Sequence, residues 1–84
     1  MSNLIAKIAR LKIAFKAMKE KTKLDHSEWV QADNLDEIRI IEINDHLDPK
    51  KEGKLMVENE HGTEFSIDEL SDDELDVLIF SLEN

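Results

Sequence analysis

The chain has 84 residues, no cysteine and a formal net charge of −9. This length fits one small domain, and the lack of cysteine excludes disulfide staples and thiolate metal sites. At 40% hydrophobic residues the chain has too many large aliphatic side chains for a typical disordered segment. No apolar run reaches the roughly 20 residues that span a bilayer. A reducing compartment is the default for such a chain, so we expect a cytoplasmic protein.

The net charge conceals a strong division along the chain. Residues 1–24 hold seven basic residues against Glu20 alone, which gives +6, and the remainder holds 4 basic and 19 acidic residues, which gives −15. Such asymmetry is typical of a basic arm for an anionic partner, or of a basic helix that lies on its own acidic body. We divide the single domain, residues 1–84, into a basic amphipathic helix over 1–23 and an acidic β-meander plus C-terminal helix over 36–84.

The first predicted element is a helix over residues 3–22, with Ser2 or Asn3 as its N-cap. Apolar residues recur at helical spacing along one face, namely Leu4, Ile8, Leu11, Phe15 and Met18. The opposite face carries Ala6, Ala9, Ile13 and Ala17, where a surface helix would usually carry charges. Either alanine serves there only as a good helix former, or this face is a second contact surface. Under the second interpretation Ile13 and Ala17 are candidate partner-binding residues.

The central predicted strand covers residues 37–43 and contains four isoleucines. Because side chains alternate along a strand, Ile38 and Ile40 would point to one face of the sheet, and Ile41 and Ile43 to the other. Either both faces of this strand are covered, or a bulge lies between Ile40 and Ile41. Ile41 is therefore a further candidate for partner binding.

Two irregular segments flank this strand. Residues 23–35 form a connector that contains Trp29, the only tryptophan, which is either a lid over the core or an exposed binding anchor. Residues 44–53 form a loop with the only proline, so no ladder continues through it. The triplet Asp45-His46-x-Asp48 could offer metal ligands, but such triplets are common in acidic loops, and we predict no metal site.

A β-hairpin is predicted over residues 54–59 and 63–67, and its register can be derived. A two-residue turn would mix apolar and polar side chains on each face, whereas the three-residue loop Glu60-His61-Gly62 places the apolar ones together. The three-residue loop also puts Gly62 at the left-handed position that such loops require. The resulting apolar pairs are Val57 with Phe65 and Leu55 with Ile67.

The last predicted element is a helix from Asp72 to Glu83. Ser66–Glu69 and Ser71–Glu74 both match the Ser-x-x-Glu capping box, and the second is followed by an apolar stripe. That stripe is Leu75, Leu78, Ile79 and Leu82. Val77 and Phe80 lie opposite the stripe, so this helix too has apolar residues on its outward face.

The sequence shows no pattern that is specific for catalysis. It has only two glycines and therefore no phosphate-binding loop, and its serines lack the context of a nucleophile elbow. None of the many carboxylates lies in an apolar setting that would raise its pKa for acid catalysis. We predict a protein that is not an enzyme, with no catalytic residues, no cofactor and no metal.

We expect an α+β fold with an N-terminal helix, a three-stranded antiparallel β-meander and a C-terminal helix (αβββα), both helices packing on one face of the sheet. The leading functional hypothesis is a non-catalytic protein-interaction module that acts by surface binding and self-associates as a homodimer or small assembly. One alternative is an acidic inhibitor that imitates nucleic acid and occupies the site of a basic nucleic-acid-binding protein. Another is binding of an anionic membrane or nucleic acid through the basic helix. The candidate partner-binding residues are Ile13, Ala17, Trp29, Ile41, Val77 and Phe80.

Overall fold

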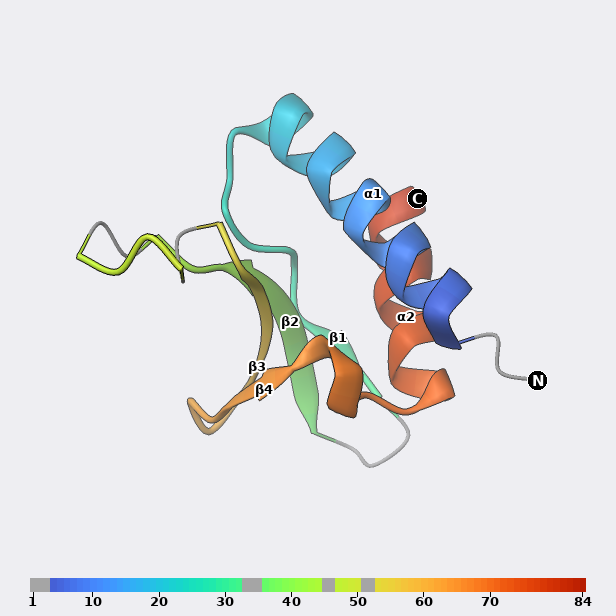
Figure 1. The fold of residues 1–84 in the computed structure, drawn as a ribbon. Helices are drawn as coiled ribbons and strands as arrows, with labels where there is room; N and C mark the ends of the chain where they lie inside the picture. Colours follow the sequence, from blue (N-terminus) through green and yellow to red (C-terminus); the bar gives the residue numbers. More distant parts are fainter. Residues whose placement is uncertain (1–3, 33–35, 45–46, 51–52) are drawn as a thin grey trace.

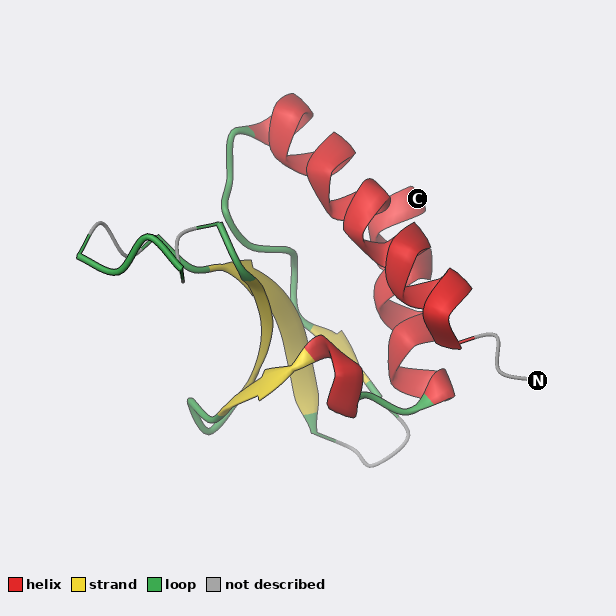
Figure 2. Cartoon of the chain, in the orientation of Figure 1, coloured by secondary structure: helices red, strands yellow, loops and turns green. Residues whose placement is uncertain are grey.

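The computed structural model describes residues 4–32, 36–44, 47–50 and 53–84 (Figure 1). Along the chain the elements are α1 (Leu4–Thr22), β1 (Val30–Gln31), β2 (Glu37–Glu42), β3 (Leu55–Asn59), β4 (Glu64–Ser66), a short 3-10 turn η1 (Ile67–Glu69) and α2 (Asp72–Glu83). The strands form one antiparallel sheet in the order β1-β2-β3-β4. Figure 2 shows both helices on the same face of this sheet, which confirms the α+β class and the placement of the helices.

The helix α1 forms and packs as its apolar stripe predicts. Leu11 and Phe15 are 0% and 1% exposed and lie in the core between the helices and the sheet. The helix ends where Lys23 takes a positive φ of 65° and donates its backbone N–H to the carbonyl of Lys19 over 2.8 Å. The predicted N-cap, Ser2 or Asn3, lies outside the described residues.

The central strand β2 has apolar residues on both faces and no bulge. Its pairing with β3 runs without a slip, and Ile40 lies opposite Val57. Ile38 and Ile40 are 2% and 0% exposed and face the helices. By alternation, Ile41 lies on the sheet face that points away from the helices, where it is half-buried.

The hairpin β3–β4 adopts the predicted register, with Val57 opposite Phe65. The Asn59 side-chain oxygen accepts hydrogen bonds from the backbone of His61 and Thr63 over 2.9 Å and 3.0 Å, and Gly62 has a φ of 84°. The side chain therefore closes the three-residue loop, and the glycine supplies the left-handed residue.

The predicted pairing of Leu55 with Ile67 is not part of the ladder. β4 ends at Ser66, and Ile67 begins η1, where it still enters the core at 4% exposure. The cause is the first Ser-x-x-Glu box, which forms a complete capping box from Ser66 to Glu69 and turns the chain into a 3-10 helix.

The prediction of three strands was wrong by one, because the connector supplies β1. Val30 pairs with Ile38 and Gln31 with Glu37 along the free edge of β2. The connector is also held to β2 by Ser27, whose hydroxyl accepts a hydrogen bond from the Ile40 backbone over 3.0 Å. A strand of two residues shows no periodicity of its own, so it forms only through this pairing.

The helix α2 covers Asp72–Glu83, as predicted. Ser71 accepts a hydrogen bond from the Glu74 backbone over 3.2 Å, and the Glu74 carboxylate accepts one from the Ser71 backbone over 2.9 Å. Leu75 and Leu78 are fully buried. The capping box thus fixes the first turn of α2, and the apolar stripe of α2 packs into the core on the side of the sheet that carries both helices.

Candidate protein-interaction surfaces

Ion pairs join the two helices along a seam. The Lys7 amine lies 3.3 Å from an Asp72 oxygen and 3.0 Å from an Asp76 oxygen, and Arg10 Nε donates to a Glu83 oxygen over 2.8 Å. The hydrogen bond to Asp76 raises the pKa of Lys7, and the hydrogen bond from Arg10 lowers the pKa of Glu83 below its ordinary value of 4.5. Since residues later in α1 pair with residues later in α2, the helices run in the same general direction (Figure 1).

Apolar side chains flank this seam on the side that faces away from the sheet. Ile13 and Phe80 are 71% and 70% exposed. Ile13 follows Arg10 by three residues, and Phe80 precedes Glu83 by three, so each lies one turn from the ion pair between the helices. Ala17 is exposed and lies one turn beyond Ile13 on the same face of α1. We call Ile13, Ala17 and Phe80 the helix outer face.

Val77 does not belong to this outer face. The sequence placed it with Phe80 on the outward side of α2, but it is half-buried and packs against the core. The reason is β1, which contacts α2 and places Val30 and Gln31 beside Val77 in a shallow surface depression that the more exposed Phe80 also lines. The strand that sequence reasoning missed therefore covers a residue that it expected to be open.

Trp29 and Ile41 lie on a different side of the molecule, the open face of the sheet. The Arg39 guanidinium stacks over the Trp29 ring at 4.6 Å and pairs with a Glu58 oxygen at 2.9 Å. Trp29 is 40% exposed and lies outside the buried core, so its interpretation as a core lid was wrong. Five of the six candidate residues thus fall on two faces of the molecule with the core between them, and the sixth, Val77, packs against the core.

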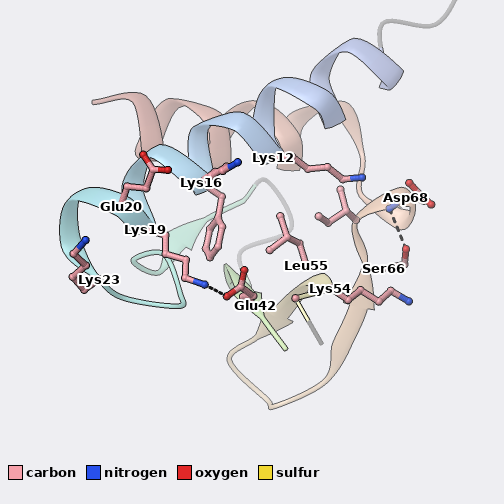
Figure 3. Close-up of a pocket in the computed structure, with 13 residues that line it drawn as sticks. Lys12, Lys16, Lys19, Glu20, Lys23, Glu42, Lys54, Leu55, Ser66 and Asp68 are labelled. Atoms are coloured by element: carbon pink, nitrogen blue, oxygen red, sulfur yellow. Dashed lines mark hydrogen bonds and ion pairs between the residues drawn. The ribbon is translucent and has the colours of Figure 1, made fainter. Parts of the chain in front are cut away.

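Sequence reasoning missed a third feature, a cavity of about 800 Å³ between α1 and one end of the sheet (Figure 3). Phe15, Leu55 and Ile67 lie among its lining residues. Lysines also line it, namely Lys12, Lys16, Lys19, Lys23 and Lys54. Four of these lysines follow one another along α1 and its end at spacings of four, three and four residues. This helical spacing was the one sign in the sequence that they share a face of the helix. We call this site the basic cavity.

A smaller polar group lies beside the hairpin loop. Potential ligand atoms of Asp36, Glu60 and His61 lie within 4.8 Å of one another, and His61 Nε2 is 4.0 Å from an Asp36 oxygen. Glu60 and His61 are exposed, and carboxylates in such positions are common on an acidic surface. The candidate ligands Asp45 and His46 of the predicted loop lie outside the described residues.

Comparison with known proteins finds no matching family model, no matching curated protein and no matching solved structure. Within the described part of the chain, neither helix offers a stretch long and apolar enough to cross a membrane.

Proposed function

We propose that this protein is a non-catalytic interaction module that forms a homodimer through the helix outer face. The observation that carries the proposal is the exposure of Ile13 and Phe80, at 71% and 70%, on two helices whose core-facing sides already bury other apolar residues. Neither side chain contributes to the core, so neither is needed for folding. Burial of such side chains against a partner is favourable by about 25 cal/mol per Å² of apolar area.

The charges of the two helices are compatible with a second copy as the partner. α1 carries six basic residues and one acidic residue, whereas α2 carries five acidic residues and no basic one. Asp72, Asp76 and Glu83 already pair with Lys7 and Arg10 of their own chain. A two-fold axis near the seam that sets α1 of each copy against α2 of the other therefore adds no strong ion pair, but it avoids like charges across the apolar contact. Such a contact is self-complementary and closes after two chains.

The size of this surface fits a dimer of modest affinity. With 19 residues, α1 is about 28 Å long, and two adjacent helices are about 20 Å wide. Their outer surface is therefore somewhat smaller than the roughly 800 Å² per partner of a standard interface. We expect dissociation in the micromolar range.

Light scattering coupled to size exclusion tests the proposal with a matched pair of variants. Ile5 is 80% exposed on α1, as Ile13 is, but points to another side of the helix. Ile13→Asp is expected to give a monomer at concentrations where the wild type is a dimer, and Ile5→Asp is expected to remain dimeric. Equal masses for the two variants would contradict this use of the outer face.

A second candidate function is the acidic inhibitor that imitates nucleic acid. It is supported by exposed carboxylates on the hairpin and η1, such as Glu64 and Asp68, which lie away from the basic residues of the seam. The affinity of such an inhibitor for a basic partner would fall steeply with ionic strength. The apolar contact of a homodimer would respond much less, so a salt titration separates the two proposals.

Binding of an anionic membrane through α1 has less support. An amphipathic helix binds a membrane by burying its apolar face in the lipid boundary. In α1 that face contains Leu11 and Phe15, which are already buried in the core. Without local unfolding, α1 could offer a membrane its basic residues and the exposed side chains of Ile5 and Ile13, but not its main apolar face.

A further inference from the structure

We infer that the basic cavity binds an amphiphile that has one alkyl chain and one anionic head group. The cavity lies where the C-terminal half of α1 diverges from the sheet, on the side that faces the ends of β2 and β4 and the start of β3 (Figure 3). Its volume of about 800 Å³ falls within the roughly 300–1,000 Å³ of small-molecule sites. The site is separate from the helix outer face and does not depend on dimerisation.

The floor of the cavity is apolar. Phe15 comes from α1, Leu55 from β3 and Ile67 from η1, and all three belong to the core or pack against it. Because core packing holds these residues, the floor is formed before any ligand arrives. An alkyl chain that lies on this floor would leave water without displacing a core side chain.

The walls combine apolar stems with cationic ends. Lys12 and Lys16 come from α1 and Lys54 from the opposite wall, and all three are exposed. A lysine in such a position lays its methylene stem along apolar surface and keeps its amine in water. Among the described residues none of these three amines forms an ion pair, so each is available to an anion. Figure 3 shows Lys12 and Lys54 extending toward the end of the cavity formed by η1.

One lysine has a different role. The Lys19 amine pairs with the Glu42 carboxylate and so links α1 to the end of β2 across the cavity (Figure 3). Glu42 is largely buried, with 15% of its side chain exposed. The pair neutralises this carboxylate and holds α1 to the sheet. Among the other charged residues that line the cavity, the four lysines Lys12, Lys16, Lys23 and Lys54 outnumber the two carboxylates of Glu20 and Asp68, so the lining keeps a net charge of +2.

The charge of the whole protein favours a ligand with a single anionic head group over a polyanion. A net charge of −9 repels nucleic acid or a run of acidic residues, and the repulsion grows with each charge on the ligand. A ligand with one head group is repelled only weakly by the net charge of the protein, and its head group is attracted locally by the lysines. Its alkyl chain adds apolar burial that a polyanion lacks.

Methyl-detected NMR titration of the full chain tests the inference. The probes are sodium dodecanoate and dodecyl phosphate below their critical micelle concentrations, with sodium acetate, decan-1-ol and hexaglutamate as comparisons. Dodecanoate is expected to bind with a dissociation constant of about 0.1 mM or tighter and to shift the methyl signals of Leu55 and Ile67. Acetate lacks the chain and decanol lacks the charge, so both should bind at least about tenfold more weakly. The stronger of the two dodecyl ligands identifies the head group.

Charge reversal provides matched variants. Lys16→Glu and Lys54→Glu should each weaken dodecanoate binding about tenfold. Lys21→Glu makes the same change of charge on α1, but Lys21 does not line the basic cavity, so affinity should stay within about twofold. The inference is overturned if dodecanoate fails to bind at about 1 mM, or if the largest shifts fall on Ile13. It is also overturned if Lys16→Glu and Lys21→Glu act alike, or if hexaglutamate binds as tightly as dodecanoate.

Discussion

Removal of the Phe80 ring should dissociate the dimer while leaving the fold intact. A phenylalanine presents about 200 Å², so at 70% exposure about 140 Å² of it is available to a partner. If half of that area is buried in the dimer, each ring contributes about 1.75 kcal/mol and the two symmetry-related rings about 3.5 kcal/mol. Phe80→Ala is therefore expected to raise the dissociation constant by a factor of roughly several hundred.

The same substitution should lower the free energy of unfolding of the monomer by only about 1 kcal/mol. Only about 60 Å² of the ring is covered within one chain, which corresponds to about 1.5 kcal/mol, and alanine recovers roughly 0.5 kcal/mol as a better helix former. Sedimentation equilibrium measures the first effect, and urea unfolding at low protein concentration measures the second. Leu75→Ala is the reverse control, because Leu75 is fully buried and its truncation should cost about 2–5 kcal/mol of folding free energy. An unchanged dissociation constant for Phe80→Ala would refute the reasoning.

Three smaller predictions concern the fold. Ser71→Ala removes the hydroxyl that accepts from the Glu74 backbone and should lower the free energy of unfolding by about 1 kcal/mol, or about 4–8 °C in melting temperature, measured by circular dichroism. Gly62→Ala meets no atom within 4 Å but must keep a φ of 84°, so urea titration should show a loss of about 1–2 kcal/mol. Because Arg10 lowers the pKa of Glu83 in the folded state, this carboxylate stabilises the fold above its ordinary pKa of 4.5, and that contribution is lost as the pH falls further. Glu83→Gln should accordingly flatten the decline of melting temperature below that pH, and a decline identical to that of the wild type would contradict the role of the pair.

Sequence reasoning predicted correctly the elements that are determined by residues within one short segment of the chain. The hairpin register followed from two constraints that agreed, the alternation of Val57 and Phe65 and the left-handed requirement at Gly62, and the structure confirmed both. The capping box at Ser71 fixed the start of α2 in the same way. Each of these features needs only residues within one short segment.

The elements that depend on distant contacts could not be predicted. Val30 and Gln31 form a strand only because the edge of β2 is available, and this strand in turn buries part of Val77. The spacing of Lys12, Lys16 and their neighbours was visible in the sequence. These lysines line a cavity only because α1 diverges from the end of the sheet, and the angle between the helix and the sheet is set by tertiary packing.

The most direct test of the proposed dimer is sedimentation equilibrium of the wild-type protein from about 5 µM to about 500 µM. A chain of 9.7 kDa that associates through the helix outer face should approach twice that mass as the concentration rises. A mass that stays at 9.7 kDa across the whole range would contradict the proposal that Ile13 and Phe80 serve as a contact surface between two copies.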